Sequence, residues 1–126
     1  MRLSDWGPAR FVLVGIAAAA VHYMVALLIN GVLGVPPAWA NPLAFVTAFP
    51  VSYVGHRVFS FPQARLPHRQ ALPRFMTVAV SSFVGNQALL LVLLQQLAWP
   101  FWFALGVTLV TVALATYVFS RYWAFR

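Results

Sequence analysis

The sequence contains no cysteine, no lysine and a single acidic residue, Asp5. Without thiols it has no disulfides, thiolate metal sites or cysteine nucleophiles, and one acid cannot form a pair of catalytic carboxylates. Charged residues make up 7% of the 126 positions, whereas soluble domains average about 25%. This small number of charges cannot solvate a globular surface. We therefore expect the chain to lie in a membrane.

Four apolar stretches are each long enough to cross a bilayer, which takes roughly 20 residues. Three run over about 11–33, 38–58 and 75–97, and the fourth follows Pro100 and ends near Tyr122. None contains Lys, Asp or Glu, and continuous apolar runs of this length do not alternate as barrel strands do. The predicted fold class is therefore an all-α membrane protein of four transmembrane helices.

The positive charges lie on one side of these spans. All eight basic residues are arginines, and they precede the first span, flank or occupy the middle loop, or close the chain. The positive-inside rule then places both termini and the middle loop in the cytoplasm. The first span exceeds the roughly 7–15 apolar residues of a signal peptide, so we expect it to be retained.

The sequence also aligns on itself when it is shifted by 64 positions. Thirteen identities fall over residues 10–61, among them Pro36 with Pro100 and Arg57 with Arg121. We interpret this as a single membrane domain of two tandem repeats, 10–61 and 74–125, joined by a cytoplasmic loop, 62–73. Each copy has an even number of crossings, so the two have the same orientation.

One constellation occurs in both repeats at the cytoplasmic end of a helix. Tyr53 lies one turn before Arg57, and an aromatic residue, Phe59, follows. The second repeat has the same arrangement in Tyr117, Arg121 and Trp123. The guanidinium fork suits phosphate oxygens and aromatic faces suit sugar rings, which predicts a lipid-phosphate site. The alternative is ordinary anchoring at the membrane interface.

Arg10 and Arg74 open the odd-numbered spans at the same interface. They either extend the phosphate site to four arginines or only set the topology. His56, also at this interface, is expected to be solvated.

Polar residues also lie at the middle of two spans. His22 is central in the first, and Asn86, beside Gln87, is its equivalent in the third. They either line a path for a polar head group or form a hydrogen bond between helices that holds the two repeats together. Close helix approach is expected at small residues, including Gly15 and Gly85.

The motifs resemble those of GtrA-like proteins. The first span opens Arg10-Phe11-x-x-Val14-Gly15, and the third opens in a similar way from Arg74. That family closes each half with an Asn-Arg-x-Trp-Thr-Phe motif. Here the closures are 56–61, HRVFSF, and 120–125, SRYWAF. The Arg and final Phe occur in both, the Trp only in the second, and the Asn in neither.

This resemblance implies a flippase that moves a polyprenyl-phosphate-linked monosaccharide across the bacterial cytoplasmic membrane. A separate membrane glycosyltransferase then uses the sugar for cell-surface polysaccharide. The alternatives are a non-transporting partner of such an enzyme and, least favoured, a small-solute exporter. We expect no catalytic residues, metal, cofactor or nucleic-acid partner, and a homodimer is one possible assembly.

Overall fold

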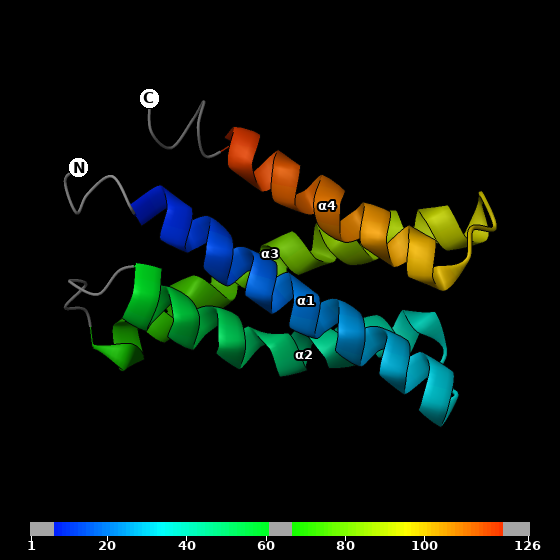
Figure 1. Cartoon of the computed structure of the whole chain (residues 1–126), viewed down its shortest axis with the longest axis horizontal. Helices are drawn as coiled ribbons and strands as arrows, with labels where there is room; N and C mark the ends of the chain where they lie inside the picture. The colour runs from blue at the N-terminus through cyan, green and yellow to red at the C-terminus, as the bar shows by residue number, and fades with distance from the viewer. Residues whose placement is uncertain (1–6, 61–66, 120–126) are drawn as a thin grey trace. The chain divides into compact units, whose positions relative to one another are not determined.

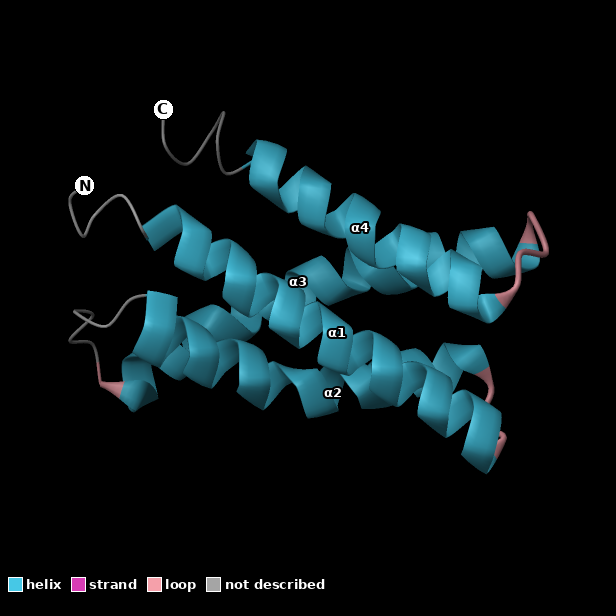
Figure 2. Cartoon of the chain, in the orientation of Figure 1, coloured by secondary structure: helices cyan, strands magenta, loops and turns pink. Residues whose placement is uncertain are grey.

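The computed structural model describes residues 7–60 and 67–119, and every regular element within them is helical (Figures 1 and 2). The elements are α1 (Gly7–Leu33), α2 (Pro37–Gly55), the π-helix η2 (His56–Ser60), α3 (His68–Gln95) and α4 (Phe101–Phe119). The all-helical class and the number of long helices agree with the sequence prediction. α3 begins at His68, inside the segment 62–73 that was expected to be a loop.

Two of the described helices have the length and apolar composition of membrane spans. They cover Ala9–Leu33 and His68–Gln95, whereas the apolar part of α4 is shorter, at Phe101–Ala115. Large apolar side chains on α1 are largely exposed, with Met24 at 68% and Val32 at 72%. A soluble protein would not leave such surface in contact with water, so these faces suit contact with lipid.

The chain forms two compact units, Met1–Val80 and Ser81–Arg126. In the first unit α1 and α2 pack side by side and run in opposite directions (Figure 1). Small residues of α2 are fully or nearly buried, namely Ala40, Ala44 and Ala48, and α1 contributes Val14 and Ala26. Small side chains let helix backbones approach closely, which strengthens dispersion contacts where lipid removes the hydrophobic driving force.

The glycine at the closest approach is Gly55, near the end of α2. A Cβ atom there would lie 2.7 Å from Cγ1 of Val14, so only glycine fits without a shift of the Val14 side chain or of the helix backbone. At Gly15 and Gly85, where close approach was expected, no atom of the described residues of the same unit lies within 4 Å of a Cβ. Sequence spacing identified small residues but not the face that meets the neighbouring helix.

A left-handed residue follows both α1 and α3. Gly34, directly after α1, has φ of 70°, and the next N–H donates to the carbonyl of Ile29 at 3.3 Å. Ala98, three positions after the last residue of α3, has φ of 54°, and the next N–H donates to the carbonyl of Leu93 at 3.3 Å. Each hydrogen bond reaches back six positions across the left-handed residue and satisfies a carbonyl near the end of the helix. The two turns are 64 positions apart in the sequence.

Buried residues also recur at a spacing of 64 positions. Five pairs of positions 64 apart are buried in both members: His22 and Asn86, Ala26 and Leu90, Ala40 and Ala104, Asn41 and Leu105, and Ala44 and Thr108. These pairs account for most of the buried residues in the described part of the chain. A shift of 64 therefore relates local turn geometry and burial as well as residue identity.

Candidate functional site

Aromatic rings from three helices meet at one end of the first unit. His56, the first residue of η2, stacks on Phe11 of α1 with ring centroids 4.5 Å apart. Phe75 of α3 lies against the same imidazole at 5.9 Å and against the ring of Tyr53 at 5.6 Å. We call Phe11, Phe49, Tyr53, His56 and Phe75 the aromatic cluster. It holds the start of α1, the end of α2 and the start of α3 together.

His56 corrects a prediction made from the sequence. It was expected to be solvated at the interface, but it is only 7% exposed. Phe11 and Phe75, the aromatic residues that open the first and third spans, both contact it and exclude solvent. The sequence places His56 beside an arginine, which suggested exposure, but gave no sign that these phenylalanines converge on it.

A row of aromatic rings continues from this cluster along α2. Phe45, Phe49 and Tyr53 are spaced four residues apart and therefore lie on one helical face. Neighbouring centroids are 6.2 Å and 6.3 Å apart, and the Phe49 and Tyr53 rings are nearly parallel, at 4°. Phe75 packs against Phe49 at 5.6 Å. This face of α2 is therefore aromatic from its middle to its end.

The hydroxyl of Tyr53 shares a hydrogen bond of 2.6 Å with Nδ1 of His68. His68 is exposed and is the first residue of α3, so the bond joins α2 to the following helix. Tyr53 was predicted to act with Arg57, one turn away. Its hydroxyl is instead directed to a residue that the sequence analysis did not assign to the site.

The arginines of the predicted phosphate site differ in their surroundings. The guanidinium of Arg10 lies over the ring of Phe59, 5.4 Å from its centroid, in a cation–π contact. Arg10 and Arg57 are partly buried, whereas Arg74 is exposed. The structure thus brings α1 and η2 together through one predicted arginine and one predicted aromatic residue.

Arg121 and Trp123 lie outside the described residues. Tyr117 lies in α4, but its side chain is also outside them.

The π-helix η2 is a feature that the sequence analysis missed. It follows α2 directly and contains Arg57 and Phe59. The wider turn of a π-helix is uncommon and often occurs at functional sites, because it shifts the register of the side chains that follow. No residue pattern used in the sequence analysis distinguishes a π-turn from the end of an α-helix.

The polar residue at the middle of α1 has a partner within its own unit. Nε2 of His22 lies 2.6 Å from Oδ1 of Asn41 in α2, and both side chains are buried. This hydrogen bond joins two helices of the same unit, whereas the sequence interpretation of His22 placed such a bond between the two halves of the chain. Asn41 was missed, because nothing in its local sequence indicates that it faces α1.

The second unit has buried polar residues of its own. Asn86 of α3 is 5% exposed and Gln87 is partly buried. Thr108 of α4 is fully buried, and its hydroxyl has no hydrogen-bond partner in the described part of the structure. Thr108 was not predicted. It is 64 positions from Ala44, so sequence comparison of the repeats could have drawn attention to it.

Comparison with known families gives a match over residues 10–125, nearly the whole chain, to the family described as GtrA/DPMS, transmembrane domain. The chain belongs to this family. No curated protein and no solved structure matches it. Membership in the GtrA/DPMS family confirms the resemblance drawn from the motifs and identifies the chain as a membrane protein.

The described part of this GtrA/DPMS domain carries charges of only one sign. Its formal charges are all positive, because Asp5 lies outside the described residues. Nor do these residues include a group of three His, Cys, Asp or Glu side chains that could hold a metal ion. The guanidinium forks of Arg10 and Arg57 match the geometry of phosphate oxygens.

Proposed function

We propose that this protein is a flippase for a polyprenyl-phosphate-linked monosaccharide in the bacterial cytoplasmic membrane. The GtrA/DPMS family is linked to translocation of lipid-linked sugars. The observation that carries the proposal is the position of Arg10 and Arg57 on adjoining elements, with Arg10 against the ring of Phe59. Arginine forks next to aromatic faces suit a phosphate that carries a sugar.

In this proposal both termini and the loop 62–73 face the cytoplasm. The lipid phosphate binds Arg57 or its equivalent Arg121, with Arg10 and Arg74 contributing charge at the same interface. The sugar then becomes available, after translocation, to a membrane glycosyltransferase that modifies cell-surface polysaccharide. A homodimer would supply more interior volume than four helices enclose.

We further propose that the chain consists of two tandem repeats, 10–61 and 74–125, with four membrane crossings. The matched left-handed turns and the five pairs of buried positions support this division. The repeats are not equivalent at their centres. His22 is bonded to Asn41 in one, whereas Leu105 takes the place of Asn41 in the other. His22, Asn86 and Gln87 provide the polar groups at mid-depth of their own halves.

The test is transport of a labelled polyprenyl-phosphate sugar by the purified protein in proteoliposomes. We expect Arg57→Ala together with Arg121→Ala to reduce flipping at least tenfold, because two phosphate-binding forks are lost. Arg69→Ala is the matched control, since Arg69 is an exposed arginine near the same interface and outside the proposed site. Equal flipping by the double variant and the control would remove the arginines from the mechanism.

A second function, a non-transporting partner of a glycosyltransferase, is distinguished by a lysine substitution at Arg57. Anchoring needs only positive charge, which lysine provides, whereas a phosphate fork needs the planar guanidinium. A partner protein should therefore tolerate Arg57→Lys, copurify with the enzyme and fail to flip lipid alone. A flippase should lose activity with Arg57→Lys.

A further inference from the structure

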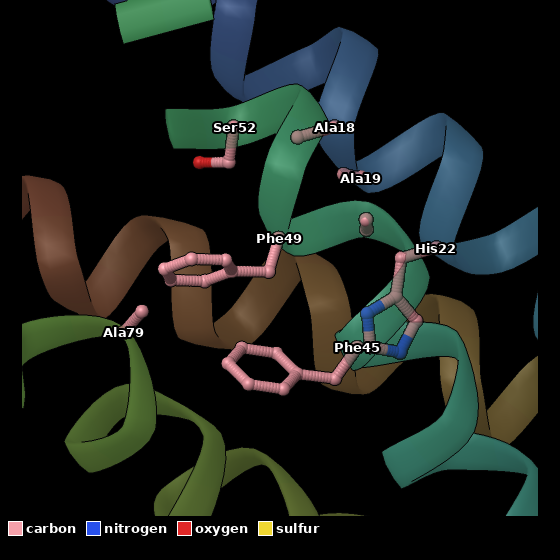
Figure 3. Close-up of a pocket in the computed structure, with 8 residues that line it drawn as sticks. Ala18, Ala19, His22, Phe45, Phe49, Ser52 and Ala79 are labelled. Carbon is pink, nitrogen blue, oxygen red and sulfur yellow. The ribbon is translucent and has the colours of Figure 1, made fainter. Parts of the chain in front are cut away.

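A pocket of about 150 Å³ lies within the first unit between α1, α2 and the start of α3 (Figure 3). The rings of Phe45 and Phe49 form one wall. Six of its eight lining residues are alanine or phenylalanine, and the polar exceptions are His22 and Ser52. The pocket is therefore an apolar recess with small side chains opposite two aromatic rings.

The pocket extends along α2 from a level near Arg57 towards the middle of the proposed membrane span. Ser52 precedes Arg57 by five residues and Phe45 precedes it by twelve. At 1.5 Å per residue, these positions lie about 8 Å and about 18 Å below the level of Arg57. Half of the hydrocarbon core is about 15 Å thick, so the pocket covers the first part of a lipid tail rather than the head-group zone.

The size and lining of the pocket exclude several occupants. Sites that enclose a whole small ligand measure about 300–1,000 Å³, so this pocket holds only part of a molecule. A sugar would bring several hydroxyls to a recess with two polar side chains. Nε2 of His22 is already bonded to Asn41, so most of those hydroxyls would be buried without partners. An apolar chain has no such cost.

We propose that this pocket binds the phosphate-proximal isoprenoid units of the lipid carrier and so selects a polyprenyl tail over a straight acyl chain. This inference rests on the proposed function, because it takes the phosphate to be held at the level of Arg57. An isoprenoid chain carries methyl branches at regular intervals. The alanines Ala18, Ala19, Ala48 and Ala79 leave room for these branches beside the flat faces of Phe45 and Phe49.

The probe for the experiment is a farnesyl phosphate carrying a photoreactive diazirine at its tail, added to the full-length protein in nanodiscs. Farnesyl phosphate and dodecyl phosphate serve as competitors. They share the head group and the length of the main chain, but dodecyl phosphate has neither the methyl branches nor the double bonds of an isoprenoid chain. We expect labels on the segments 18–22 and 45–52, and we expect farnesyl phosphate to compete at least about tenfold better, the equivalent of one to two buried methylene groups.

Two neighbouring residues of α1 offer a matched pair of variants. Ala19 lines the pocket, whereas Ala20 is exposed on another face of the helix. Ala19→Leu should fill the recess and weaken farnesyl phosphate binding about tenfold. Ala20→Leu should leave binding unchanged. Gel filtration and thermal unfolding show whether Ala19→Leu folds. If it does not fold, the labelled positions and the ratio of the two competitors in the unaltered protein still test the inference.

Three results would overturn the inference: labels outside the pocket, equal competition by dodecyl phosphate, or equal binding by the two leucine variants. Equal competition would identify a general site for phospholipid acyl chains. Flipping by the unaltered protein is measured in parallel. Flipping without labelling of the pocket removes the inference and leaves the proposed function. Labelling of the pocket without flipping removes the proposed function and leaves a binding site for a prenyl phosphate.

Discussion

The imidazole of His22 and the carboxamide of Asn41 form a buried hydrogen bond of 2.6 Å between α1 and α2. The two residues are 19 positions apart, and the short turn after Gly34 brings their helices side by side. Neither side chain reaches water, so each depends on the other for at least one of its hydrogen bonds. The polar groups at this depth of the first unit therefore fix the register of two otherwise apolar helices.

Removal of either partner should destabilise the protein. Measured hydrogen bonds between membrane helices average about 0.6 kcal/mol and reach about 1.7, and an unpaired buried group costs more. We expect His22→Leu or Asn41→Leu to lower the free energy of unfolding by about 1–2 kcal/mol. The double variant should lose less than the sum, because no orphaned polar group remains. Unfolding in mixed micelles of detergent and denaturant measures all three, and strict additivity would contradict the pairing.

Gly55 should not accept a side chain while Val14 is present. The Cβ of Gly55→Ala would meet Cγ1 of Val14 at 2.7 Å, and such overpacking costs typically about 1–3 kcal/mol. Val14→Ala combined with Gly55→Ala should recover much of this loss. Gly15→Ala is the control, because no neighbouring atom lies near its Cβ, and it should be neutral or slightly stabilising. Thermal unfolding of the four proteins tests this, and equal effects at Gly55 and Gly15 would contradict it.

The two left-handed turns predict opposite effects of reciprocal substitutions. Gly34→Ala should destabilise the protein by about 1 kcal/mol, because a Cβ is disfavoured at φ of 70°. Ala98→Gly should stabilise it by a similar amount, because Ala98 has φ of 54° with a Cβ present. Melting temperatures of the two variants should therefore move in opposite directions. A loss of stability in Ala98→Gly would mean that the alanine methyl group has a packing role.

The link between α2 and α3 can be separated into its hydrogen bond and its ring packing. Tyr53→Phe removes the bond to His68 but keeps the ring against Phe75, so we expect a loss below about 1 kcal/mol. Phe75→Ala removes contacts with Tyr53, Phe49 and His56, and we expect a loss of about 3 kcal/mol. Hydrogen exchange at the start of α3 should rise strongly only in Phe75→Ala. Equal exchange in both variants would argue against packing as the main link.

Composition and hydropathy were enough to predict an all-helical membrane protein, and the motif beginning at Arg10 was enough to indicate its family. The helix ends near Leu33 and Pro36 followed from glycine and proline, which act through local backbone geometry. These features depend on short stretches of sequence. They were therefore predictable without knowledge of how the helices pack.

The contacts were less predictable because they depend on which faces of the helices meet. Gly15 and Gly55 are both glycines in apolar helices, and only the packing distinguishes them. His56 has the sequence surroundings of an interfacial residue, yet two distant phenylalanines bury it. Asn41 was overlooked because its partner lies in the preceding helix. The roles proposed for Arg57 and the other predicted site residues remain predictions.

The π-helix η2 allows the direction of the side chains at this end of the chain to be changed by one residue. A π-turn can be viewed as an α-helix with one inserted residue. Deletion of one residue from His56–Ser60 would restore ordinary helical winding and rotate every following side chain by about 100° about the axis. A single codon could thus redirect Phe59 away from Arg10 without lengthening or shortening the apolar part of α2. Related sequences could change the contacts of Phe59 in this way while keeping the length of the apolar helix.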